Sequence, residues 1–90
     1  MSAPEFEWDE AKSRANKFKH GIDFTEARAL WLDSFSTTAV PRTLGESRFI
    51  VIGMIAGKHW TAVITHRGAA VRIISVRRSR VREVQTYESQ

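Results

Sequence analysis

The chain of 90 residues has 14 Lys or Arg, 10 Asp or Glu and three His, a net charge of +4, and 42% hydrophobic residues. We expect one domain spanning residues 1–90. The absence of cysteine excludes disulfides and thiolate metal sites, and the three histidines lack metal-ligand spacing, so we expect no metal and no cofactor. Neither a membrane span nor a secretory signal is apparent, and we expect a cytosolic protein with no membrane contact.

Two short helices are predicted first. Asp9 is a suitable N-cap for a helix over Glu10–Lys19, and Gly21 can end it in the left-handed conformation. Its apolar face is expected to hold Ala11, Ala15 and Phe18. Asp23 followed by Glu26 resembles a capping box for a second helix that ends near Asp33, with Phe24, Ala27, Leu30 and Trp31 on its apolar face. Phe6–Trp8, before both helices, suits either an edge strand or an apolar staple under the first helix.

From residue 35 the hydrophobic period changes to two, which predicts strands at residues 35–40, 48–55, 59–66 and 69–76. Turns are expected at residues 44–47, 56–58 and 67–68. Connections this short require antiparallel neighbours. Ser79 is a candidate cap for a last helix that reaches Tyr87. The predicted fold class is α+β, with two N-terminal helices, a four-stranded, mainly antiparallel sheet and a C-terminal helix.

The net charge is concentrated at the end of the chain. Residues 1–66 hold eight basic and eight acidic residues, whereas residues 67–90 hold six Arg and two Glu. A solvated basic face is one interpretation of this pattern. The segregation favours the other, a binding surface, because the guanidinium fork is always charged and grips phosphate at two points. Arg77, Arg78, Arg80 and Arg82 follow the apolar strand that begins near Arg72, and we expect Arg67, at the preceding turn, to converge with Arg77 and Arg78.

An ordered set of short motifs spans nearly the whole chain. It comprises Phe6-Glu7-Trp8-Asp9, Lys12, Asn16, Lys19-His20-Gly21-Ile22, Phe24, Glu26-Ala27, Arg48-Phe49, Ile52-Gly53, Arg67-Gly68, Arg72-Ile73-Ile74-Ser75, Arg77-Arg78, Glu83 and Tyr87. The set resembles the BrnT family of toxins of bacterial type II toxin-antitoxin systems. His66 departs from the family pattern, which often has an acidic or small polar residue before Arg-Gly; we interpret this as a neutral surface change.

The resemblance implies a RelE-like fold and a metal-independent endoribonuclease that inhibits translation. It also implies a BrnA-like antitoxin that forms a hetero-oligomer with the toxin and alone contacts operator DNA. Cleavage by the RNA 2′-hydroxyl needs proton transfer and positive charge on the phosphorane. The expected catalytic residues are His20 for acid-base chemistry and Arg67, Arg77 and Arg78 on the phosphate. The expected substrate-binding residues are Lys19, Ser75, Arg80 and Tyr87.

Each role has a structural alternative. His20 can simply cap its helix, Lys19 can be solvated, Ser75 can satisfy a neighbouring group, and Tyr87 can pin the last helix to the sheet. Glu83 can pair with Arg80 or Arg82, or orient an active-site arginine. Two alternative functions use the same arginines: a non-catalytic nucleic-acid-binding module, and an interaction subunit whose activity has decayed.

Overall fold

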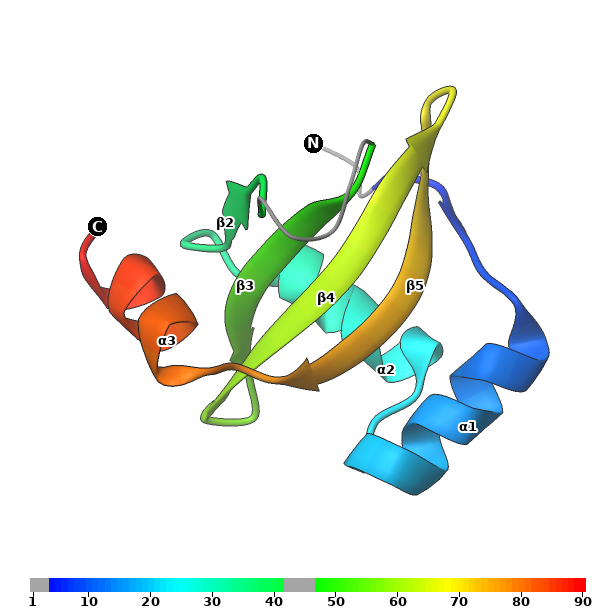
Figure 1. Ribbon diagram of the computed structural model, residues 1–90, viewed down its shortest axis with the longest axis horizontal. Helices are drawn as coiled ribbons and strands as arrows, with labels where there is room; N and C mark the ends of the chain where they lie inside the picture. Colours follow the sequence, from blue (N-terminus) through cyan, green and yellow to red (C-terminus); the bar gives the residue numbers. More distant parts are fainter. Residues whose placement is uncertain (1–3, 42–46) are drawn as a thin grey trace.

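The computed structural model describes residues 4–41 and 47–90 as three α-helices, a 3-10 helix and one five-stranded mixed sheet (Figure 1). The elements are β1 (Phe6–Glu7), α1 (Glu10–His20), α2 (Phe24–Ala27), η1 (Arg28–Leu32), β2 (Thr37–Ala39), β3 (Phe49–Ile55), β4 (Lys58–Arg67), β5 (Ala70–Arg78) and α3 (Val81–Glu88). The strand order is β1-β5-β4-β3-β2. In the described part of the chain, no helix has the length and apolar character needed to cross a membrane.

The predicted α+β class is confirmed, but the prediction of four strands was wrong, because the sheet has five. Strand β1 pairs in parallel with β5 at the edge of the sheet, while the other neighbouring strands are antiparallel. Its two residues are too few to show a period, so the sequence left a strand and a staple as alternatives. Residues 44–46 of the turn predicted at residues 44–47 lie outside the described residues.

The sheet has two differently covered faces. On one face, the apolar side chains of α2 and η1 pack over β3, β4 and β5 and form the larger core; Figure 1 shows this layer behind the sheet. On the other face, a smaller cluster of Ile50, Ile52 and Val63 is joined by Tyr87 of α3. No residue of α3 is fully buried, so this second face is only partly covered. We refer to it as the open face.

Helix α1 has the predicted ends, but the side of the helix that faces the rest of the domain is the opposite of the predicted one. Asp9 accepts a hydrogen bond from the backbone N–H of Lys12, and Gly21 ends the helix with φ 83°. The predicted apolar face is nevertheless exposed, and the Phe18 side chain is 96% exposed. The buried residues of the helix are Ser13 and Asn16.

The reason is that α1 lies along a free edge of β5. The Asn16 amide donates to Val76 O at 2.9 Å and accepts from Val76 N at 3.1 Å, as a neighbouring strand would. The same amide donates to Ile22 O at 2.8 Å, and the Ser13 hydroxyl accepts from Phe24 N at 3.0 Å. Buried backbone groups require such partners, and polar side chains therefore face inward.

The capping box of the second helix is confirmed by reciprocal bonds between Asp23 and Glu26. Helix α3, in contrast, does not begin with Ser79 as its cap. Arg80 occupies the N-cap position and its backbone N–H donates to the Glu83 carboxylate at 2.8 Å. The Ser79 hydroxyl instead contacts the Thr61 hydroxyl at 2.7 Å, and this bond ties the connection after β5 to β4.

Candidate nucleic-acid interface

Arg67 lies at the opposite end of the sheet from Arg77 and Arg78, so the predicted convergence of these residues was wrong. Arg67 pairs with Ala70 beside the hairpin turn, whereas Arg77 pairs with Thr61. Residues 61 and 67 are six positions apart on β4, which corresponds to roughly 20 Å at 3.3 Å per residue. An antiparallel hairpin places its turn at one end of the sheet and the exit of its second strand at the other.

At its own end, Arg67 belongs to a separate ionic group. Its Nε lies 3.3 Å from Glu7 Oε1, and Arg72 Nη1 lies 3.4 Å from the same oxygen. Glu7 belongs to β1, so this group joins the edge strand to the hairpin. Its two arginines, Arg67 at the end of β4 and Arg72 in the first half of β5, both share the Glu7 carboxylate.

Arg77 and Arg78 point to opposite faces of the sheet, as successive strand residues do. The Arg78 guanidinium lies 5.5 Å from the ring centroid of Trp60, a member of the larger core, and its Nε donates to His59 O at 3.2 Å. Arg77 instead faces α3 on the open face, through the contacts described next. The two neighbouring arginines therefore cannot form one two-residue clamp.

A bidentate pair fixes Arg77 against α3. Its Nη1 and Nη2 donate to the two Glu83 carboxylate oxygens at 2.7 and 2.8 Å. Thr61 and the Arg80 backbone also donate to this carboxylate. Burial works to raise the pKa of Glu83, but these hydrogen bonds lower it to about 2. The Glu83 hydrogen bond likewise raises the pKa of Arg77. Of the two roles expected for Glu83, orientation of an arginine is the one seen here.

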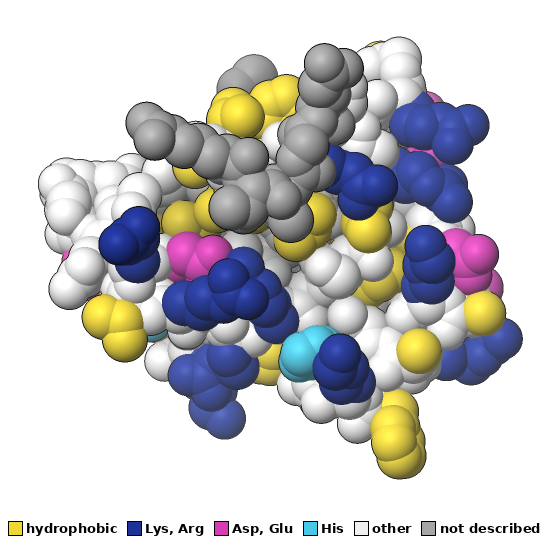
Figure 2. Space-filling model, viewed as in Figure 1, with side chains coloured by type: hydrophobic (Ala, Val, Ile, Leu, Met, Phe, Trp, Pro, Cys, Tyr) yellow, Lys and Arg dark blue, Asp and Glu magenta, His cyan; other side chains and the backbone are white. Residues whose placement is uncertain are grey.

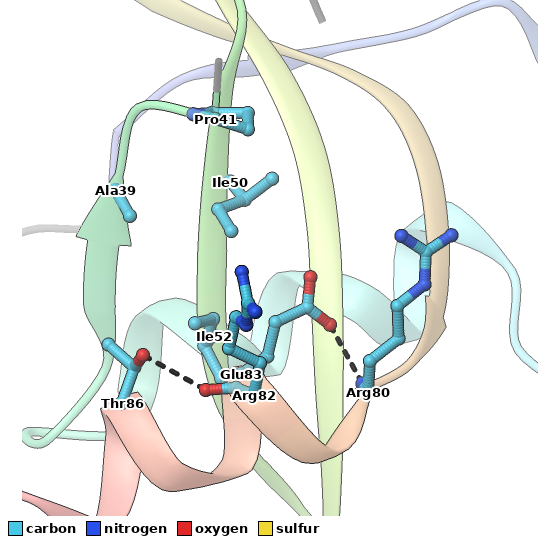
Figure 3. Close-up of a pocket in the computed structure, with 8 residues that line it drawn as sticks. All are labelled: Ala39, Pro41, Ile50, Ile52, Arg80, Arg82, Glu83 and Thr86. Atoms are coloured by element: carbon cyan, nitrogen blue, oxygen red, sulfur yellow. Dashed lines mark hydrogen bonds between the residues drawn. The ribbon is translucent and has the colours of Figure 1, made fainter. Parts of the chain in front are cut away.

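The open face is hollowed beside this pair. One hollow of about 250 Å³ is lined by the polar residues Ser75, Arg77, Arg80 and Glu83 over apolar residues of the sheet. An adjoining hollow of about 480 Å³ shares Arg80 and Glu83 and adds Arg82 and Thr86. Figure 3 shows the second hollow, with Ile50 above Arg82, Ile52 beside it, and Arg80 to the right of Glu83. We call the two together the arginine hollow; in Figure 2 basic side chains gather over this part of α3.

His20 and Lys19 are not among the residues that line the arginine hollow. His20 follows Asn16 by one helical turn and is half-buried, while Lys19 is exposed. His59, which the sequence did not single out, lies on β4 near α3, with its Nε2 2.7 Å from Glu88. Among residues 4–41 and 47–90, no group of three or more His, Asp or Glu side chains could hold a metal ion.

Tyr87 anchors α3. Its hydroxyl donates to Asp33 Oδ2 at 2.6 Å, and its ring packs edge-on against His59. The bond to Asp33 raises the pKa of Tyr87 to about 12. Burial works to raise the pKa of Asp33, but hydrogen bonds from Tyr87 and from two backbone N–H groups lower it. These contacts agree with the structural interpretation of Tyr87, that it pins the last helix to the sheet.

The fold and the arginine hollow define a small basic α+β domain with the chemistry to bind phosphate groups. Residues 8–83 match the family described as ribonuclease toxin, BrnT, of type II toxin-antitoxin system. This match covers most of the chain, and the chain belongs to that family of ribonuclease toxins. A comparison with curated proteins found no match.

Proposed function

We propose that the chain is a metal-independent endoribonuclease toxin that acts in the cytoplasm, inhibits translation and is neutralised by a BrnA-like antitoxin. The observation that carries the proposal is the arginine hollow, in which Ser75, Arg77 and Arg80 meet on one face of the sheet. Membership of a ribonuclease toxin family supports RNA as the substrate. The arginines of the hollow can stabilise the negative charge that develops on the phosphorane when a phosphodiester is cleaved.

Arg77 can bind a phosphate without leaving Glu83. A guanidinium has five N–H donors, and the bidentate pair uses one from each Nη. The Nε–H and the second Nη2–H form an adjacent side-on fork, which suits two oxygens of a phosphate. Glu83 thus holds the arginine in place before the substrate arrives. Arg80 and Arg82 add charge at the rim, and the Ser75 hydroxyl can donate to a phosphate oxygen.

Proton transfer is the second requirement. We propose His20 for this role, with Arg78 and Lys19 as backbone contacts, because α1 runs beside the end of β5 where Arg77 and Arg78 emerge. An RNA strand would then pass around this end of the sheet, from the arginine hollow toward α1. Arg67, about 20 Å away by strand length, is assigned no part in the reacting site.

The activity is tested with purified protein, free of antitoxin, and RNA in EDTA. We expect cleavage that leaves 2′,3′-cyclic phosphate ends, since the 2′-hydroxyl is the nucleophile. A strict requirement for Mg²⁺ would reject the metal-independent mechanism. In cells, expression of the toxin alone should arrest growth, and co-expression of the antitoxin should restore it.

The position of the site is tested with two matched charge removals. Arg80→Ala removes one exposed charge at the rim of the hollow and should lower the cleavage rate, by less than the roughly 100-fold that loss of a preorganised donor costs. Arg67→Ala removes the same charge at the other end of β4 and should change the rate little. An equal loss in both variants would show that the arginine hollow is not the reacting site. His20→Gln should also reduce the rate if the imidazole transfers protons.

One observation favours a second function. No imidazole is among the residues that line the arginine hollow, so this surface alone could hold RNA without cutting it. In that case the protein would bind RNA in a salt-dependent manner, and neither His20→Gln nor wild type would produce new RNA ends.

A further inference from the structure

The outer side of α1 carries an apolar stripe that no element of the described chain covers. Ala11, Ala15 and Phe18 are spaced four and three residues apart and are all exposed, Phe18 to 96%. This spacing puts them on one side of the helix. The opposite side holds Ser13 and Asn16, which bind the rest of the domain.

Basic side chains border the stripe on both flanks. Helical spacing places Arg14 along one flank and Lys12 along the other, and both are exposed; Lys19, next to Lys12 on this side, is the residue proposed above for the RNA backbone. Figure 2 shows apolar side chains between basic ones in the region of α1. Lys17, on an adjoining side of the helix, is already paired with Glu26 at 2.7 Å and is not counted in these flanks. We call this surface the α1 stripe.

We propose that the α1 stripe is a docking surface for an acidic amphipathic helix of a protein partner. The basic flanks favour acidic residues on the partner, and the two alanines allow a helix to approach closely. Phe18 supplies the aromatic anchor that dominates such contacts. Taking the antitoxin as the partner rests on the proposed function.

Two other occupants fit less well. A second copy of the chain would bring two surfaces of the same positive charge together. Single-stranded RNA would be attracted by the charge, but the alanines give its bases no aromatic surface on which to stack beyond Phe18. The stripe is also separate from the arginine hollow, since α1 lies along the edge of β5 and α3 lies on the open face.

The test measures the affinity of the toxin for its purified cognate antitoxin. Phe18→Ala should raise the Kd about 10- to 100-fold, because one large apolar side chain no longer enters the interface. Arg14→Glu should raise it as well, and the effect should diminish in high salt. Leu32→Ala, which removes another side chain that is 80% exposed but lies on η1, is the matched control and should leave the Kd unchanged.

RNA cleavage by the same variants separates the possible failures. Phe18→Ala should cleave RNA as wild type does. An unchanged Kd for Phe18→Ala would overturn the docking proposal, as would a loss of RNA affinity in place of antitoxin affinity. Failure of the proposed function would appear differently, as an absence of cleavage by the wild-type toxin, whereas the binding measurement would still report on the α1 stripe.

Discussion

Replacement of Glu83 with Gln tests how strongly the bidentate pair holds α3 to the sheet. Glu83 has a side chain that is 13% exposed and a pKa lowered from 4.5 to about 2. The difference between these two pKa values corresponds to about 3 kcal/mol of stability. Because Gln resembles the protonated acid, Glu83→Gln should lower the free energy of unfolding by about this amount at pH 7.

The stabilisation by Glu83 should depend on pH in a definite direction. A carboxyl group with a lowered pKa in the folded state stabilises the protein fully above about pH 4.5, and this stabilisation is lost as the pH falls toward 2. The difference between wild type and Glu83→Gln should therefore be largest at neutral pH and should shrink between pH 5 and pH 2.

Urea denaturation followed by tryptophan fluorescence at several pH values provides the measurement. Glu26→Gln, which removes the carboxylate of an exposed ion pair, serves as the control and should have only a small effect. A stability difference for Glu83→Gln that stays the same from pH 7 to pH 2 would refute the assignment of this energy to the ionised pair.

Three further predictions concern single side chains. Asn16→Leu should destabilise the fold by about 2 to 4 kcal/mol in urea denaturation, because Val76 loses its partners at the strand edge. Tyr87, the one tyrosine of the chain, should titrate near pH 12 in ultraviolet absorbance of the folded protein and near 10 after unfolding. Gly53→Ala should cost about 1 to 3 kcal/mol in denaturation, because the added Cβ would lie 3.0 Å from Leu30 Cδ2.

The ends of the elements were the most predictable part of the fold, since they depend on local chemistry. Asp9 and Gly21 fix the ends of α1 through a side-chain cap and a left-handed residue, both visible in the sequence. The capping box at Asp23 was equally clear. Strands β3 and β4 followed from their apolar period and from the short turn at Ala56 and Gly57, both of which have positive φ.

The orientation of α1 could not be predicted in the same way. Helical periodicity assumes that a helix packs its apolar stripe on the core. Here the partner of the helix is a free strand edge, whose backbone groups need polar side chains. Asn16 and Ser13 therefore point inward, and Phe18 is left exposed. A polar buried side follows from the fact that β5 extends beyond its two-residue neighbour β1, and the sequence does not show this.

The candidate site shows the same limit. The consecutive arginines at the end of β5 appear in the sequence as one cluster, but the strand sends Arg78 toward Trp60 and Arg77 toward α3. Helix α3 then returns Arg80 and Arg82 to the Arg77 face, because it begins right after the strand and packs on the open side. The arginines that share a surface are thus separated by two or three positions, and the ionised Glu83 among them holds Arg77 in a fixed position. An arginine hollow made in this way depends on the docking of α3, so conditions that release α3 should also abolish RNA cleavage.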